Sequence, residues 1–155
     1  MISINLLTIA LIVVLLWIAI VDIKHYVIPN KASIGLILCA ILFPEAMLNI
    51  EMENRLWGIA LGFILVLTSN EIFKIWKGTD GIGMGDAKLL AAFGGLLGAY
   101  YLPFILLIGS SFGIIFFIIN HKFQFFSLTM GRIPFGPFLS FGFILCWLQA
   151  HYFAL

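Results

Sequence analysis

The stretch INLLTIALIVVLLWIAIV, residues 4–21, has no charged side chain. A helix needs roughly 20 apolar residues to cross about 30 Å of hydrocarbon, so this stretch predicts a membrane-spanning helix. No basic segment precedes it and no Ala-x-Ala cleavage site follows it, which argues against a secretory signal peptide. We therefore expect a retained first helix.

The composition of the whole chain points to the same class of fold. Hydrophobic residues make up 63% of the 155 residues, charged residues make up 10%, and the mean hydropathy is +1.19. Such a chain cannot cover itself with polar surface in water. We expect an all-α integral membrane protein in a lipid bilayer, with a single membrane-embedded domain over residues 1–155. The net charge of +1 gives no indication of a nucleic-acid partner.

Five further apolar stretches come close to the length of a membrane span. The second span contains Pro44 and Glu45 near its end, where a helix can be short or kinked. The last span follows Pro137, which suits the first turn of a helix. The predicted spans after the first are 33–50, 56–69 with an amphipathic extension over 70–76, 87–101, 102–119 and 138–153. The sequence therefore predicts a bundle of six transmembrane helices.

Lysine and arginine are distributed unevenly between the predicted loops. Short loops that are rich in these residues stay in the cytoplasm. The second and fourth loops contain only Arg55, whereas the other loops contain Lys24, Lys31, Lys74, Lys77, Lys88, Lys122 and Arg132. We therefore predict that the odd-numbered loops are cytoplasmic and that both termini lie outside the cytoplasm.

Glycines recur four residues apart in three of the predicted helices. Small residues at this spacing let helix backbones approach closely in lipid. The pairs are Gly58 and Gly62, Gly94 and Gly98, and Gly109 and Gly113. A compact bundle is the expected result.

Two aspartates fall on the same side of the predicted bundle. Asp22 follows the first span and Asp86 precedes the fourth, so both lie at the cytoplasmic face and at a similar depth. Ionisable groups at membrane depth are functional candidates by default. Two structural explanations stay open: Asp86 as the N-cap of its helix, and Asp22 in an ion pair with Lys24, Lys31 or Lys88.

Two neighbouring carboxylates can activate a water molecule. Like charges cannot both ionise cheaply, so the pair holds one proton between them. The ionised member can take a proton from water while the neutral member donates its proton to a peptide carbonyl oxygen. Gly83 and Gly85 would let the backbone turn tightly beside Asp86 and let a substrate strand lie close. This chemistry needs no metal ion or other cofactor.

Other catalytic or metal sites find less support in the sequence. No His-Glu-x-x-His motif is present. Cys39 and Cys146 each lie alone in an apolar run, without a Cys-x-x-Cys pairing. We therefore expect both cysteines to be buried apolar residues rather than zinc ligands.

Three segments, spread over most of the chain, carry a resemblance to a known family. They are DIKHYVIPN at residues 22–30, GMGDAKLLAAFG at residues 83–94 and RIPFGPFLSFG at residues 132–142. In this order they resemble the aspartate segment, the Gly-x-Gly-Asp signature and the Pro-Phe-Gly-Pro-Phe element of the type IV prepilin leader peptidases. The archaeal preflagellin peptidases are shorter relatives of that family.

The resemblance implies a membrane aspartic endopeptidase in the inner membrane of a prokaryote. It would remove the short basic leader from prepilin or pseudopilin precursors at the cytoplasmic face, cutting after a glycine. Asp22 and Asp86 match the family's catalytic pair, and Asp80 or Glu71 could meet the basic leader.

Longer members of the family carry an N-terminal cytoplasmic extension, often with paired cysteines, that is associated with methylation of the new N-terminus. This sequence starts with its first helix and has no Cys-x-x-Cys. The resemblance therefore implies a peptidase without methyltransferase activity.

Two other classes of function stay open at this point. A proton or cation carrier could use the same aspartate pair, with the shared proton as its cargo. A non-catalytic assembly factor of a pilus or secretion machine could also retain both aspartates. The residues give no indication of an oligomeric state.

Overall fold

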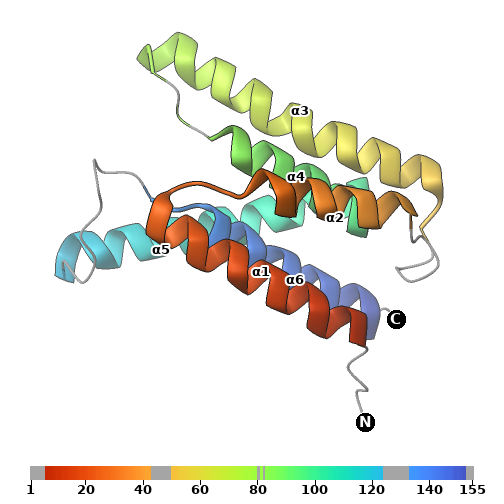
Figure 1. Ribbon diagram of the computed structural model, residues 1–155. Coiled ribbons are helices and arrows are strands. Elements are labelled where there is room, and N and C mark those ends of the chain that lie inside the picture. The colour runs from red at the N-terminus through yellow and green to blue at the C-terminus, as the bar shows by residue number, and fades with distance from the viewer. Residues whose placement is uncertain (1–5, 43–49, 80, 82, 124–132, 153–155) are drawn as a thin grey trace.

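The computed structural model describes residues 6–42, 50–79, 81, 83–123 and 133–152, and this part of the chain is helical without strands (Figure 1). The elements in order are α1 (Leu6–His25), α2 (Asn30–Leu42), α3 (Met52–Lys77), α4 (Met84–Leu97), the 3-10 turn η2 (Ala99–Tyr101), α5 (Leu102–Phe123) and α6 (Gly136–Tyr152). The prediction of an all-α protein with six helices is confirmed for the described residues.

Within the described residues, three helical segments are long and apolar enough to cross a membrane. They are Leu6–His25, Met52–Lys77 and Ala99–Lys122, the last of which joins η2 and α5. The helices α2, α4 and α6 have 13, 14 and 17 residues, which is short of the roughly 20 that a span needs. This architecture supports a membrane protein, while six complete spans and the direction of the termini stay predictions.

Several predicted boundaries are confirmed and others are wrong. The third helix continues without interruption to Lys77, as expected, and Pro137 lies in the first turn of α6. The fourth helix ends at Leu97 instead of reaching Tyr101, because Gly98 has a φ of 84° that ends the α-helical path. Residues 43–49, where the predicted second span contained Pro44 and Glu45, lie outside the described residues.

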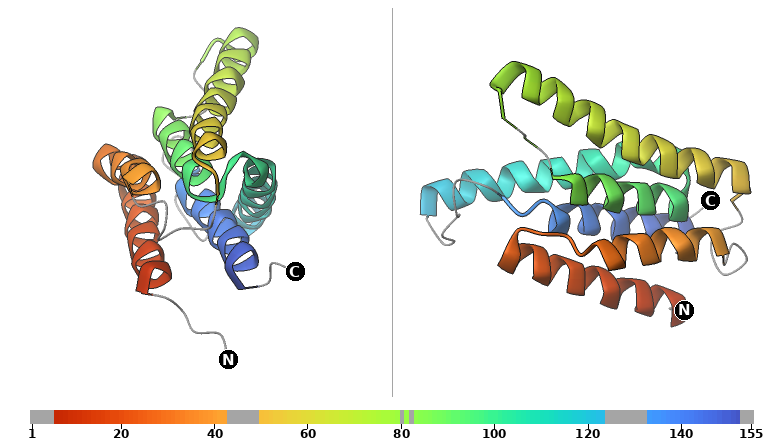
Figure 2. Two further views of the ribbon diagram at one scale, coloured as in Figure 1. Left: turned by 90° about the vertical axis from the view of Figure 1, so that its right-hand side faces the viewer. Right: turned by 45° about the horizontal axis from the view of Figure 1, so that its top comes forward.

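The short helix α4 lies at the centre of the bundle. All of its residues from Ala87 to Leu97 are buried except Lys88. It packs against α2, α3 and α6, and Figure 2 shows it among these helices in the view from the right-hand side of Figure 1. A helix that is apolar all round needs such surroundings, so its burial follows from its composition.

Glycine backbones set the distance between α3 and α4. The backbones of Gly58 and Gly94 are in direct contact, and a Cβ atom on Gly62 would lie 2.6 Å from the carbonyl oxygen of Leu90. A side chain at any of these glycines would push the helices apart. The prediction of close packing is confirmed for these positions, whereas Gly98 serves to end α4.

The helices α1 and α6 lie side by side at the other edge of the bundle (Figures 1 and 2). The indole N–H of Trp147 donates a hydrogen bond to the hydroxyl of Thr8 at 3.3 Å, and both side chains are buried. Cys146, one residue before, is buried as expected, but Cys39 on α2 is exposed, so that part of the prediction was wrong.

Arg55 is buried, although it stood out in the sequence only as a lone basic residue in a predicted loop. Its side chain is 0% exposed, its Nη1 donates to the carbonyl of Ala40 at 3.0 Å, and its Nε donates to the carbonyl of Ile50 at 2.9 Å. Ala40 lies in the last turn of α2, where carbonyl groups have no partner within the helix. Arg55 therefore joins α3 to the C-terminal end of α2.

Candidate active site

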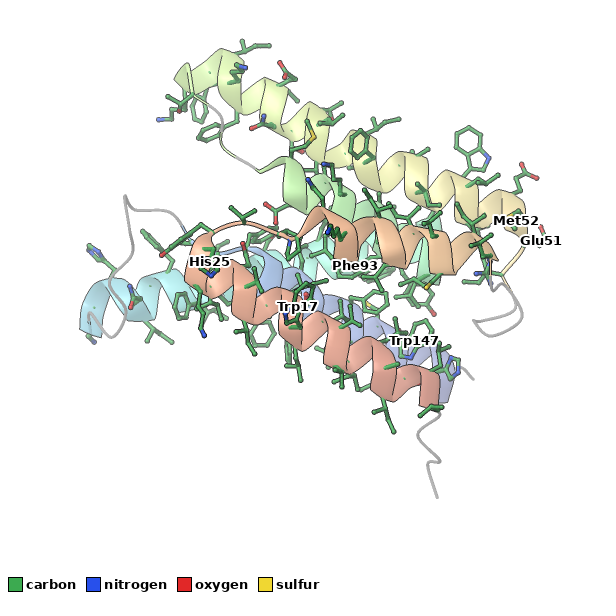
Figure 3. All side chains as sticks on the ribbon, in the orientation of Figure 1. Trp17, His25, Glu51, Met52, Phe93 and Trp147 are labelled. Atoms are coloured by element: carbon green, nitrogen blue, oxygen red, sulfur yellow. The ribbon has the colours of Figure 1, made fainter. Side chains whose placement is uncertain are left out.

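Several helix ends meet at one side of the bundle. The helix α1 ends there and α2, α4 and α6 begin there, while the C-terminal ends of α3 and α5 project further (left-hand side of Figure 1). Figure 3 shows His25 at this end of α1, and it shows Glu51, Met52 and Trp147 toward the opposite end. Asp22 and Asp86 both belong to the end with His25, as the alternation of the helices predicted.

Asp22 lies in the last turn of α1, where its side chain is 5% exposed. Its Oδ2 accepts a hydrogen bond from the backbone N–H of Gly136 at 2.9 Å. Its backbone carbonyl accepts a hydrogen bond from Tyr26 at 2.8 Å, and Tyr26 ends α1 with a φ of 54°. The sequence placed Asp22 at the end of the first helix, which is confirmed, and the structure adds a partner on α6.

Asp86 lies in the first turn of α4 and is half-buried. Its carboxyl group interacts with the backbone N–H of Gly83. Gly83 is the N-cap residue, so the alternative that Asp86 is the N-cap was wrong by three positions. This is one half of a capping box, in which a side chain of the first turn reaches back to the N-cap N–H, and the glycine N-cap has no side chain to return the bond.

The structure brings the two aspartates together. Asp22 is the ionisable group that acts on Asp86 through space, by electrostatic repulsion between the two carboxylates. Both groups are withdrawn from water, and two such neighbours favour a state with one shared proton. The two carboxyl groups are therefore close enough to interact electrostatically, and their catalytic use stays a prediction.

Two contacts hold the start of α4 against the segment that follows α1. A Cβ atom on Gly85 would lie 2.9 Å from the Cβ of Ile28, so the missing side chain permits this approach. The Nζ of Lys88 donates a hydrogen bond to the Oδ1 of Asn30 at 2.9 Å. Because Asp86 lies between Gly85 and Lys88, these contacts fix its position relative to α1 and α2.

The tight turn predicted at the two glycines beside Asp86 is not formed, while the predicted room for a substrate strand stays a prediction. Gly83 has extended backbone geometry and is exposed, so it is the residue where the chain enters the helix. Gly85 is already helical and serves packing, not a turn.

The alternative ion pair of Asp22 is not formed among the described residues. Lys88 bonds to Asn30, and Lys24 and Lys31 are exposed without an ion pair to Asp22. The only side-chain hydrogen bond of Asp22 in that part of the chain is the one from Gly136.

Of the two residues predicted to contact a substrate, the structure describes Glu71. Glu71 is exposed on the projecting end of α3, on the same side of the bundle as the aspartates. Asp80 lies outside the described residues. The neighbouring Gly81 donates its N–H to the Oδ1 of Asn70 on α3 at 2.9 Å, which ties Gly81 to α3.

A serine motif lies in α5. The run GSSFG at residues 109–113 has the spacing Gly-x-Ser-x-Gly. It lies within α5, and the hydroxyl of Ser111 donates to the backbone carbonyl of Leu107 at 2.7 Å. In this helix Gly109 faces α6, where its Cβ would lie 3.2 Å from the Phe138 carbonyl oxygen. The glycines serve helix packing.

Among the described residues, no group of three or more histidine, cysteine, aspartate or glutamate side chains could hold a metal ion. Gly136, Asn30 and Lys88 are the site residues that sequence reasoning did not assign. All three lie in the segments that carry the resemblance, which is the signal that could have drawn attention to them.

The fold and site define a helical membrane protein with a paired-aspartate site at one end of the bundle. The chain belongs to the type IV leader peptidase family, because the model of that family matches residues 9–118, which include Asp22 and Asp86.

Curated relatives agree with this assignment. The chain is 30% identical over 127 residues to a prepilin leader peptidase/N-methyltransferase of Stutzerimonas stutzeri, covering 81% of this chain and 43% of the relative. It is 31% identical over 121 residues to the protein of that name from Dichelobacter nodosus, covering 77% and 40%. The match to the Legionella pneumophila protein is 31% over 130 residues, covering 81% and 44%. The chain thus spans less than half the length of these relatives. No solved structure was found to match it.

Proposed function

We propose that this protein is a membrane aspartic endopeptidase that removes the basic leader from type IV prepilin-like precursors. The observation that carries the proposal is the meeting of Asp22 and Asp86 at the ends of α1 and α4, within the region matched by the family. The names of the relatives support leader peptides of prepilins as the substrates.

The proposed reaction uses one proton shared by the two carboxyl groups. The ionised aspartate takes a proton from a water molecule, whose oxygen forms a bond to the carbonyl carbon of the scissile peptide. The neutral aspartate gives its proton to the carbonyl oxygen. When the tetrahedral intermediate collapses, the C–N bond breaks and the proton taken from water passes to the leaving amine. One hydroxyl of the intermediate returns its proton to the other aspartate as the carboxyl product forms, so the pair again holds one proton. No covalent enzyme intermediate forms.

The proposed substrate contacts follow from charge and position. A basic leader would approach the site along the projecting end of α3, where Glu71 is exposed. Asp80, in the segment between α3 and α4, is the second proposed contact for the leader. The apolar helix that follows the cleavage site would pack against the bundle in the bilayer, and cleavage after a glycine is proposed from the resemblance.

We further propose that the site faces the cytoplasm of a prokaryotic cell, within the inner membrane. The support is the excess of lysine and arginine in the segments at this end of the bundle. A cysteine introduced at exposed Lys24 should react with an impermeant maleimide in inverted membrane vesicles and stay unmodified in intact spheroplasts, in a background without Cys39 and Cys146. The opposite labelling pattern would contradict this orientation.

The test of the activity is cleavage of a purified prepilin in liposomes, followed by intact-mass analysis of the product. Wild type is expected to cut after the leader glycine, and Asp22→Asn and Asp86→Asn should each lower kcat by at least about 10³-fold. Glu53→Gln is the matched control, because Glu53 is an exposed acid in the first turn of α3 at the other end of the bundle. If folded wild type cut none of several prepilins, or if either asparagine variant kept full activity, the proposal would be refuted.

A further inference from the structure

The start of α6 has a single backbone donor that is not used within the helix. Pro137 has no N–H. The N–H groups of Phe138 and Leu139 both bond to the carbonyl of Phe135, at 3.1 Å each. Among the first four residues of α6, this leaves the N–H of Gly136, which donates to the Oδ2 of Asp22 at 2.9 Å.

This contact crosses between helices that are far apart in the sequence. Asp22 is 114 residues from Gly136, and both residues are buried. The N-terminus of a helix carries a partial positive charge, and a hydrogen bond from an N–H to a carboxylate is stronger than one to a neutral acceptor. The start of α6 therefore stabilises the charged form of Asp22 and occupies one of its two oxygens.

The contact requires glycine. A Cβ atom at position 136 would lie 2.8 Å from the Oδ2 of Asp22 and 3.2 Å from its Cγ. Contacts of this length are not tolerated by a rigid neighbour, so any other residue would displace the carboxyl group or α6.

No charged side chain among the described residues pairs with Asp22, so the start of α6 is the partner that stabilises its carboxylate. On α1, Lys24 and His25 are exposed. From α4, Asp86 repels it, and Lys88 is bonded to Asn30. The first turns of α6 contain no ionisable residue.

We propose that Gly136 is a positioning residue, whose N–H holds Asp22 in its ionised form as the group that takes the proton from water. Asp86 is then the member that carries the shared proton and donates it to the carbonyl oxygen. This assignment rests on the proposed peptidase function and adds the division of roles between the two aspartates.

The sharpest test replaces the amide nitrogen of residue 136 by an ester oxygen, using glycolic acid in place of Gly136. This change removes the N–H and adds no side chain. Asp22 becomes harder to ionise, so the acidic limb of kcat/KM against pH should move upward by about 1 to 2 pH units, with kcat lowered and KM little changed. The same ester at Gly35 inside α2 removes an ordinary helical hydrogen bond and should leave the pH profile in place.

A second variant tests the space around the carboxyl group. Gly136→Ala should lower kcat by at least about tenfold at every pH, because its Cβ displaces Asp22. Gly35→Ala is the matched control, because a Cβ there meets nothing within 4 Å. A wild-type pH profile and kcat in the ester variant would overturn the proposal, and so would full activity of Gly136→Ala.

A crosslink separates failure of the contact from failure of the function. In a background with Cys39→Ala and Cys146→Ala, Asp22→Cys with Gly136→Cys should form a disulfide on mild oxidation. The expected Cβ–Cβ separation is 3.4 Å, close to the spacing that a disulfide needs. Asp22→Cys with Gly35→Cys should not crosslink. No crosslink in the first pair would refute the contact, whereas a crosslink in a protein whose wild type cuts no prepilin would refute the proposed function and the role of Gly136 with it.

Discussion

Replacing Gly85 by alanine should disable the site without unfolding the helix that carries it. The new Cβ would lie 2.9 Å from the Cβ of Ile28, whereas ordinary van der Waals contact begins at 3.4 Å. Ile28 is 6% exposed, so it has little room to move. Relief therefore requires the start of α4 to shift by between about 0.5 and 1 Å relative to the segment after α1.

This shift acts directly on the carboxyl pair, because Asp86 is the next residue in the chain. A misplacement of about 1 Å at a catalytic group can cost about 10²-fold in rate. The effect on stability is smaller: overpacking costs about 1 to 3 kcal/mol, and alanine in a helix regains about 1 kcal/mol relative to glycine. We expect kcat for prepilin cleavage to fall by roughly 10- to 100-fold. The net cost in stability is at most about 2 kcal/mol, so the thermal midpoint should fall by no more than about 8 °C.

The assay compares single-turnover cleavage of a purified prepilin in liposomes by wild type and Gly85→Ala, with Gly35→Ala as the control. The Gly35 position offers open space for a Cβ, so the same change of residue should leave the rate and the thermal midpoint near those of wild type. Cleavage by Gly85→Ala at the wild-type rate would show that this contact does not position Asp86. Loss of folded protein in Gly85→Ala would instead show that the packing is less tolerant than the distances indicate.

Three further predictions concern the packing of the bundle and the hydrogen bond at the start of α4. Gly58→Leu should separate α3 from α4 at the backbone contact with Gly94. The detergent-solubilised protein should then show a markedly lower thermal midpoint or fail to accumulate. A midpoint equal to that of wild type would contradict the contact. Arg55→Met leaves buried carbonyl groups without their donor, so it should cost about 1 to 3 kcal/mol of stability, measured by thermal unfolding, while the cleavage rate per folded molecule stays unchanged. Lys88→Met and Asn30→Ala should each lower kcat/KM by about fivefold, because both remove the same hydrogen bond of 2.9 Å. The double variant should then be no worse than either single variant. Additive losses in this double-mutant cycle would show that the two residues act independently.

Some of the fold could be predicted because its causes are local. The apolar run that ends at Val21 and the similar runs after it set the number of helices in the described residues, and the continuous α3 followed from its pattern. Alternation of helix direction then placed Asp22 and Asp86 at the same end. Helix ends were predicted less well where a single residue decides them, as with the positive φ of Tyr26 and Gly98.

The sequence by itself determined that this chain forms apolar helices suited to a membrane and that two aspartates share one end of the bundle. Both conclusions depend on residues near one another in the chain and on the order of the helices. Only the tertiary structure decided which backbone group each aspartate meets, as with Asp22 and the N–H of Gly136. It also decided that Gly85 lies against Ile28 and that Arg55 is buried beneath the end of α2. Such contacts join residues from different helices, and their distances depend on how whole surfaces pack, which no local pattern of residues specifies.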